Sequence, residues 1–380
     1  MTPEQEFHAK HTRLTGVLEE VGADAVVLDT EGAISWLLAG ARVHISLAGA
    51  PILRAVVHRD GVSVGVFTNE LARIRDEELA PLAALLDAGT VSLHELPWHA
   101  DVDDVVGWLP QAAGWTLIRE TGAAQQLRAV RASLLDVEVE RYRALCRSSA
   151  KALTDVLSEV TPETTERQLA AALAPRIIAA GADPVVLLVN GESRAAHRHP
   201  LPTDAPLGRR AMAVVCARRQ GLIANVTRWV GFGGAVAGED DLDARILGVE
   251  ADVFAALRPG ARLESVLETL QESYVRHGFP ADEWTKHHQG GAAGYQGRDP
   301  RVAPGVPDLI RENQPFAWNP TGWSAELGLG AKVEDTVVLR AAGGGAAGHD
   351  SGLWIDVLSV DERWPTVEVA GLARPAVLRR

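Results

Sequence analysis

The sequence has only two cysteines, Cys146 and Cys216, and no Cys-x-x-Cys or Cys/His zinc pattern. It therefore excludes a disulfide scaffold and predicts a reducing compartment, with the cytoplasm as the expected location. No run of residues approaches the roughly 18 uninterrupted apolar positions that a membrane span needs. The polar residues 1–13 also lack the apolar core of a signal peptide. We therefore expect no membrane partner.

Basic residues are outnumbered by acidic ones, 37 to 50, which gives a formal net charge of −13. Such a charge repels nucleic-acid backbones and anionic lipid surfaces, so nucleic acid is excluded as a main partner. We expect a small-molecule substrate instead. The chain of 380 residues is long enough for two or three domains, and its hydrophobic content of 47% is typical of a globular protein.

The first part of the sequence, residues 1–132, predicts an α/β domain. A helix is expected at residues 7–21, and a buried strand follows at residues 25–28. Further strands are predicted at 34–38, 53–58 and 62–68, the last two joined by the turn dipeptide Asp60-Gly61, and further helices at 70–88 and 103–112.

The remaining residues, 133–380, open with a long amphipathic helix predicted at 133–160 and then show a faint internal repeat. In each repeat a helix runs into a proline turn, a second helix starts, and a glycine closes it. These elements are Pro162, helix 168–180 and Gly181 in the first repeat, and Pro259, helix 263–277 and Gly278 in the second. Strands are expected after each helix pair, at 185–189, 211–216, 315–318 and 332–340. Two such α/β halves facing each other would enclose a cleft, where ligands commonly bind.

Several short motifs resemble the creatinase, aminopeptidase P and prolidase family, which has the pita-bread fold. They are ISWLLAGAR at residues 34–42, VTPE at 160–163, HPLPTD at 199–204, NVTR at 225–228, LRPG at 257–260, HHQGG at 287–291 and KVEDTVVL at 332–339. The resemblance implies an N-terminal creatinase-type α/β domain followed by a catalytic pita-bread domain with an internal pseudo-two-fold repeat. It also implies a homodimer.

The metallopeptidases that the chain resembles hold two divalent cations with two Asp, one His and two Glu residues. Carried over by motif, these ligands fall on Val214, Asn225, His288, Asn319 and Glu334. Only one of the four carboxylates is kept, whereas two such ions need anionic oxygen donors to replace their hydration. We therefore expect no dinuclear metal site and no cofactor. One alternative keeps a single metal ion on His199, His288 and Glu334.

Three residues are predicted to carry the chemistry: His199, His288 and Glu334. The position of His199 is that of the acid/base residue of creatinase, which works without metal, and an imidazole exchanges protons readily at neutral pH. His288 and Glu334 would form a pair in which the carboxylate orients the imidazole and raises its basicity. The alternatives are a histidine that only caps its loop and a leftover buried ion pair.

Five further residues are predicted to bind the substrate: Asn225, Asn319, Tyr295, Arg298 and Arg218. The two amides and the phenol would polarise the substrate through hydrogen bonds. The guanidinium groups would anchor a substrate carboxylate. The alternative leaves the arginines as solvated surface residues and the amides as neutral filling of former ligand positions.

The sequence therefore predicts a metal-independent, creatinase-like hydrolase or lyase that acts on a C–N bond. Its substrate would be small, amino-acid-like and carboxylate-bearing, as in a biosynthetic pathway. Two alternatives stay open: a catalytically silent pita-bread binding module and a metal-dependent Xaa-Pro aminopeptidase or dipeptidase. The trio His349-Asp350-Ser351 contains triad residue types, but the neighbouring glycines predict a loop.

Overall fold

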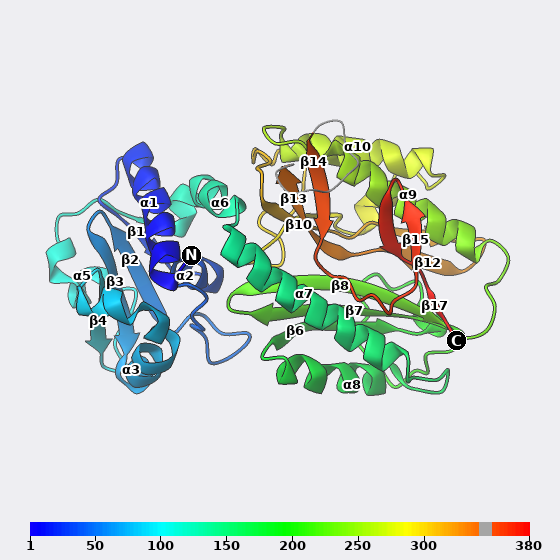
Figure 1. Cartoon of the computed structure of the whole chain (residues 1–380), viewed down its shortest axis with the longest axis horizontal. Coiled ribbons are helices and arrows are strands. Elements are labelled where there is room, and N and C mark those ends of the chain that lie inside the picture. The colour runs from blue at the N-terminus through cyan, green and yellow to red at the C-terminus, as the bar shows by residue number, and fades with distance from the viewer. Residues whose placement is uncertain (342–351) are drawn as a thin grey trace. The chain divides into compact units, whose positions relative to one another are not determined.

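The computed structural model describes residues 1–341 and 352–380, which divide into two compact units (Figure 1). The first unit is Met1–Arg131 with Gln220–Leu222, and the second is Ala132–Arg219 with Ile223–Arg380. The loop predicted around His349 lies outside the described residues. Within the described ranges, no helix is long and apolar enough to cross a membrane.

The first unit is built on a five-stranded sheet with the order β4-β3-β2-β1-β5. The strands are β1 Ala25–Leu28, β2 Leu53–His58, β3 Gly61–Phe67, β4 Val91–Leu96 and β5 Leu117–Arg119. The predicted hairpin is confirmed, because β2 and β3 pair antiparallel with His58 opposite Gly61. Helix α1, Pro3–Val21, begins with a capping box in which Thr2 and Gln5 satisfy each other's backbone N–H groups.

Three predictions for the first unit are wrong. Residues 34–38 were expected to form a strand but belong to helix α2, Glu31–Leu37, where the N–H of Ala33 donates to Thr30 Oγ1. A short apolar run fits a buried helix as well as a buried strand, and here the N-cap favours the helix. The single helix expected at 70–88 is broken near Pro81, which has no amide hydrogen to donate. Its pieces are α3 Thr68–Arg73, a π turn Ile74–Glu78, a 3-10 turn Ala80–Leu82 and α4 Ala83–Asp87. The helix expected at 103–112 is also divided, into α5 Val105–Trp108 and a 3-10 turn Pro110–Ala112.

The second unit contains the two α/β halves that the repeat predicts, so the predicted fold class is confirmed. The first half has α7 Asp136–Leu157, α8 Glu166–Ala179, β6 Asp183–Asn190, β7 Arg210–Arg219 and β8 Leu222–Gly231, in a sheet β17-β8-β7-β6 with β17 Leu378–Arg379. The second half has α9 Glu239–Ala256, α10 Leu263–Arg276, β9 Gly290–Ala292, β10 Gln314–Trp318, β13 Asp335–Ala341 and β14 Leu353–Val357, in a sheet β14-β13-β10-β9. Two strand pairs complete it, β11 Thr321–Ser324 with β12 Leu329–Lys332 and β15 Thr366–Val369 with β16 Leu372–Pro375.

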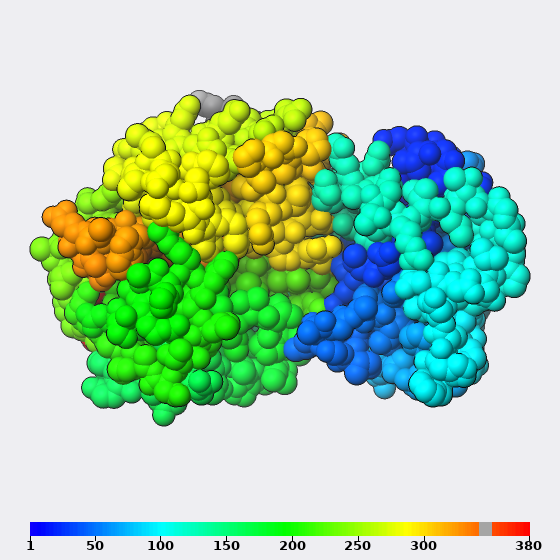
Figure 2. All heavy atoms as spheres, turned by 180° about the vertical axis from the view of Figure 1, so that it is seen from behind, coloured from blue at the N-terminus to red at the C-terminus, as the bar shows by residue number. Residues whose placement is uncertain are grey.

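The two halves meet where β8 runs beside the short segment between β12 and β13. Thr227 and Glu334 form a β-bridge at this point, and the N–H of Thr227 donates to the Glu334 carbonyl oxygen at 3.0 Å. The strand predicted at 332–340 is therefore two strands, which separate at Glu334. Figure 2 shows green atoms of the first half lying against yellow and orange atoms of the second.

The glycines that close α8 and α10, Gly181 and Gly278, have positive φ angles of 72° and 75°, as the C-cap prediction requires. Replacing Gly181 by Ala should lower the free energy of unfolding by about 1 kcal/mol, because a β-carbon is strained in the left-handed region. Gly234→Ala is the matched control, since no atom lies within 4 Å of the added β-carbon. Urea unfolding measures both variants, and equal effects would contradict the capping role.

Candidate active site

Three histidines from two segments of the second unit come together. His199 lies in the loop after the 3-10 turn Glu192–Arg194, and His287 and His288 immediately precede β9. The Nε2 atoms of His199 and His287 are 3.0 Å apart, and one ring nitrogen of each histidine lies within 4.8 Å of the other two. Sequence reasoning did not assign a role to His287, although it stands next to His288 in the HHQGG motif.

A buried ion pair ties these two segments together. Arg198 donates from Nη2 to Glu283 Oε1 at 2.6 Å and from Nη1 to the carbonyl oxygen of Thr321 at 3.1 Å. Glu283 is 1% exposed and begins the 3-10 turn Glu283–Lys286 that leads into His287. Because an unpaired buried carboxylate is costly, this contact fixes the loop of His199 beside the other two histidines.

The hydrogen bonds of His287 determine how its ring is presented. Its Nδ1 contacts the carbonyl oxygen of His288, which can only accept, so Nδ1 carries the hydrogen and the neutral ring keeps a lone pair on Nε2. The Nε2–H of His199 then donates to that lone pair. In contrast, Nδ1 of His288 is buried and has no hydrogen-bond partner among the described residues.

Burial lowers the pKa of all three imidazoles. It is the main cause of the lowered pKa of His199, and the positive charge of Lys332 adds to it. Burial, again with Lys332, lowers the pKa of His287 to about 2, and burial with Arg298 lowers the pKa of His288 to about 3. The rings are therefore neutral at pH 7, and each has one nitrogen able to accept a proton or a ligand.

Glu334, the one acidic ligand position that is kept, is bound by side-chain cations. Its Oε1 accepts from Arg298 Nη2 and its Oε2 from Thr227 Oγ1, both at 2.7 Å, while Lys332 Nζ lies 3.8 Å from Oε2. Burial raises the pKa of Glu334, but the charges of Lys332 and Arg298 and the hydrogen bonds outweigh it and hold the pKa below its usual value. The expected pair of Glu334 with His288 is thus replaced by a pair with Arg298.

Lys332 is a site residue that the sequence reasoning did not single out. Burial lowers its pKa, Glu334 opposes that shift, and Arg298 reinforces it. With His197, Trp229 and other residues it lines a small pocket beside the histidine loop. Its position at the start of the KVEDTVVL motif, two residues before Glu334, is the sequence feature that could have identified it.

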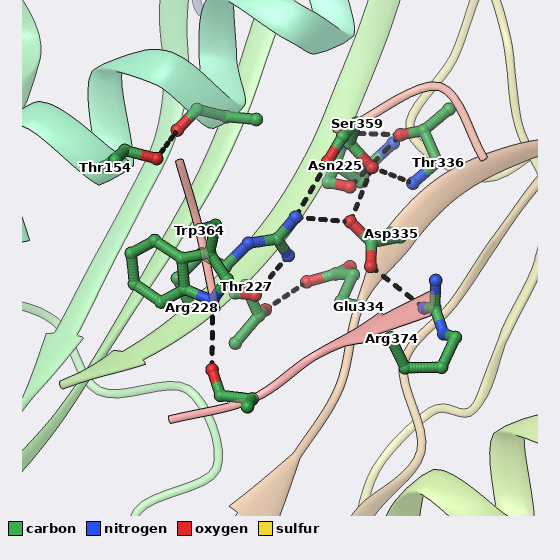
Figure 3. Close-up of polar contacts among 12 residues, drawn as sticks. Thr154, Asn225, Thr227, Arg228, Glu334, Asp335, Thr336, Ser359, Trp364 and Arg374 are labelled. Atoms are coloured by element: carbon green, nitrogen blue, oxygen red, sulfur yellow. Dashed lines mark hydrogen bonds and ion pairs between the residues drawn. The ribbon is translucent and has the colours of Figure 1, made fainter. Parts of the chain in front are cut away.

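A buried network of ion pairs fixes the backbone next to Glu334 (Figure 3). Asp335 Oδ1 accepts from Arg228 at 2.8 Å and from Ser359 at 2.6 Å, and Oδ2 accepts from Arg374 at 2.9 Å. Arg374 also makes two hydrogen bonds of 2.7 Å to Glu250. Because Arg228 belongs to β8 and Asp335 to β13, the network joins the two halves at the position of Glu334.

The two asparagines at former ligand positions differ in what they offer. Asn225 is engaged by its own sheet, since its Nδ2 donates to the carbonyl oxygen of Ile223 at 3.0 Å and its backbone N–H to Thr336 Oγ1 at 2.9 Å. Asn319 lies beside the histidines, because its N–H donates to the Gln289 carbonyl oxygen at 3.1 Å. Its Oδ1 is buried without a hydrogen-bond partner among the described residues, and it is therefore an available acceptor.

Two residues predicted to bind substrate have structural partners. The Tyr295 hydroxyl donates to Glu138 Oε1 at 2.6 Å, a buried contact with the start of α7. Arg218 pairs with Asp183 Oδ2 at 3.2 Å, across the neighbouring strands β6 and β7. Both side chains are thus engaged within the protein, and the role of Tyr295 and Arg218 in substrate binding stays a prediction.

The five ligand positions implied by the resemblance do not fit a pair of divalent cations. Val214 has no donor atom, Asn225 and Asn319 offer only neutral amide oxygens, and both oxygens of Glu334 already accept hydrogen bonds. Arg298 and Lys332 add positive charge beside the one remaining carboxylate. Hard or borderline dications need several anionic oxygen donors, so this donor set cannot hold two of them.

Comparisons with known proteins agree on one family and one fold. The sequence profile described as Metallopeptidase family M24 matches residues 140–341. The structure is similar to dipeptidase PepE from Mycobacterium ulcerans, with a TM-score of 0.73, 17% identity and 99% of each chain covered. It is also similar to the prolidase from Pyrococcus horikoshii OT3, with a TM-score of 0.69, 17% identity, and 93% of this chain and 99% of that chain covered.

A third similar structure is the N-terminal domain of FACT complex subunit SPT16 from chickpea, Cicer arietinum. Its TM-score is 0.65 at 13% identity, and the match covers 93% of this chain and 96% of that chain. A search of curated protein sequences found no match. At these identities the structural likeness shows the fold alone.

Removing the central charge of the buried network should destabilise the second unit. We expect Asp335→Asn to lower the free energy of unfolding by about 3–5 kcal/mol, because it leaves buried guanidinium groups short of a partner. The control is Asp204→Asn, which removes an ion pair with Arg167 whose side chains are 82% and 64% exposed and should change stability by less than about 1 kcal/mol. Thermal and urea unfolding measure the stability of both variants. Equal losses in the free energy of unfolding would contradict the stabilising role of the network.

Proposed function

Because the chain belongs to metallopeptidase family M24, we propose that it is a hydrolase that cleaves a C–N bond without the family's pair of metal ions. Its substrate is a small, amino-acid-like molecule that carries a carboxylate. The observation that supports this proposal most directly is the buried cluster of Arg298, Glu334 and Lys332, in which two cationic side chains face one carboxylate. A homodimer is part of the same proposal.

The charge of this cluster favours an anionic substrate. Glu334 stays ionised, because the cations and hydrogen bonds around it hold its pKa low. The guanidinium group of Arg298 is suited to pair with a substrate carboxylate, since its planar N–H donors match the two carboxylate oxygens. Fixed side-chain cations can also stabilise negative charge that develops in a transition state, which is one of the tasks that metal ions perform in hydrolases.

Proton transfer is assigned to His199, which is the most exposed of the three histidines. Its Nε2–H is held by His287, so Nδ1 carries the lone pair that can accept a proton from an attacking water and return it to the leaving nitrogen. His287 is a positioning residue, since it selects the tautomer of His199 as the third group of a catalytic triad does. His288 Nδ1 and Asn319 Oδ1 are buried acceptors suited to hold the water and a substrate N–H.

The first test uses protein stripped with a chelator and a panel of N-acyl amino acids, N-carbamoyl amino acids and Xaa-Pro dipeptides. Turnover of the preferred substrate should survive stripping, and His199→Ala should lower kcat by about 10²- to 10⁴-fold, the usual contribution of acid/base catalysis. His99→Ala is the control, because this histidine is exposed and belongs to the first unit. Turnover that depends on added divalent metal would indicate the peptidase alternative, and saturable binding without turnover would indicate a silent module.

The second test concerns the substrate carboxylate. Arg298→Gln should lower kcat/KM by about 10- to 100-fold, since hydrogen bonds to charged groups contribute about 1.5–3 kcal/mol. The loss should largely disappear with the corresponding carboxamide substrate, which has no negative charge. Arg301→Gln is the control at an exposed arginine near the site. An equal loss for acid and amide would show that Arg298 does not bind the carboxylate.

A further inference from the structure

We propose that His199, His287 and His288 form a binding site for one divalent transition-metal cation, such as Zn²⁺ or Co²⁺. The site differs from the pair of ions bound in the related metallopeptidases, because it shares only His288 with their ligand positions and contains no carboxylate. Three imidazoles and a water make a common coordination set for zinc. Nitrogen donors also select such ions over Mg²⁺ and Ca²⁺, which prefer oxygen.

The separations of the ring nitrogens suit a single ion. Two nitrogens bound to one tetrahedral zinc at about 2.0–2.1 Å lie roughly 3.3 Å apart. The Nε2 atoms of His199 and His287 are 3.0 Å apart, and the donor atoms of all three rings lie within 4.8 Å of one another. Small rotations of the rings are therefore enough to direct three nitrogens at one point.

The hydrogen bonds of the cluster are compatible with a metal ion. The contact between the Nε2 atoms of His199 and His287 gives way when the hydrogen of His199 moves to Nδ1, which leaves a lone pair on both Nε2 atoms. His287 donates its single ring N–H, on Nδ1, to the carbonyl oxygen of His288, and metal-bound histidines usually make this kind of contact. Nδ1 of His288 is buried and has no partner within the described part of the chain. A buried polar atom without a partner costs about 1–3 kcal/mol, and coordination would remove that cost.

The two segments that carry the histidines are also held in place before any ion binds. The pair of Arg198 with Glu283 fixes the loop of His199 against the turn that precedes His287. Gln289 Nε2 donates to the carbonyl oxygens of Trp284 and His287, at 2.8 and 2.7 Å, which holds the other segment. Such preorganisation lowers the entropy lost on binding.

The nearby positive charges repel a metal ion, so the proposal predicts that removing one of them strengthens metal binding. Lys332 and Arg298 both act electrostatically on the three-histidine cluster, while Glu334 partly offsets them at His199 and His288. Removing the charge of Lys332 should therefore strengthen metal binding. If His199 transfers the proton as in the proposed function, a bound ion also competes with catalysis, but the binding itself does not rest on that function.

The experiment titrates the stripped full-length protein with Zn²⁺ in competition with a chromogenic chelator, and records the visible absorption of the Co²⁺ form. We expect one ion per chain and four-coordinate cobalt bands. His287→Gln and His288→Gln should each weaken zinc binding by about tenfold or more. Removing a residue that only hydrogen-bonds to a metal ligand already lowers metal affinity by about tenfold, and removing the ligand itself should lower it at least as much. Lys332→Met should strengthen binding several-fold, and the control His99→Gln, at an exposed position of the first unit, should leave it unchanged.

The proposal is overturned by two ions per chain, by no binding, or by unchanged affinity in His287→Gln and His288→Gln. His199→Gln provides a further variant at an exposed position, where loss of folding is not expected, and circular dichroism checks that all variants are folded. Turnover of the stripped protein is measured in parallel. Absence of zinc binding with turnover intact refutes only the metal site, whereas zinc binding without turnover on any substrate refutes only the proposed reaction.

Discussion

The ion pair between Arg298 and Glu334 is the constraint from which the chemistry of this site follows. A carboxylate at the position of Glu334 would bind a metal ion through its oxygens, and here one oxygen accepts a hydrogen bond from a guanidinium and the other from a hydroxyl. Lys332 adds a second cation within the same buried region. Positive charge is thus supplied by side chains, in a family whose related metallopeptidases supply it with ions. This replacement favours an anionic substrate and opposes a second metal ion.

A second constraint is the contact between Arg198 and Glu283, which brings the histidine segments of the two halves together. It places His199 within hydrogen-bond distance of His287, and that contact selects the tautomer of His199. The same neutral nitrogens can accept a proton or a transition-metal cation. The proposed proton transfer and the proposed metal binding therefore use one set of lone pairs, and the cations around Glu334 oppose both, because they lower the pKa of the histidines and repel a metal ion.

The parts of the fold that follow local rules could be predicted from the sequence. The helix pairs of the second unit end at Gly181 and Gly278, whose positive φ angles are the reason that glycine stands there. The hairpin of β2 and β3 likewise follows from its turn. Residues 34–38 were misassigned, because a run of buried apolar residues does not by itself distinguish a helix from a strand. Strand β5 is only three residues long, and its partner β1 lies far away in the sequence, so no local sequence pattern predicted it.

By itself, the sequence determined the family, the α/β fold with its repeat, and the absence of acidic residues at three of the four positions where the resemblance implies a carboxylate ligand, since these depend on residue identity and spacing. Only the tertiary structure decided which partners the remaining residues have. Glu334 pairs with Arg298 rather than His288, Tyr295 and Arg218 are held by distant carboxylates, and His287 joins His199 across 88 positions of the chain. The physical reason is that hydrogen bonds and ion pairs act over a few ångströms, and only the folded chain determines which side chains come that close.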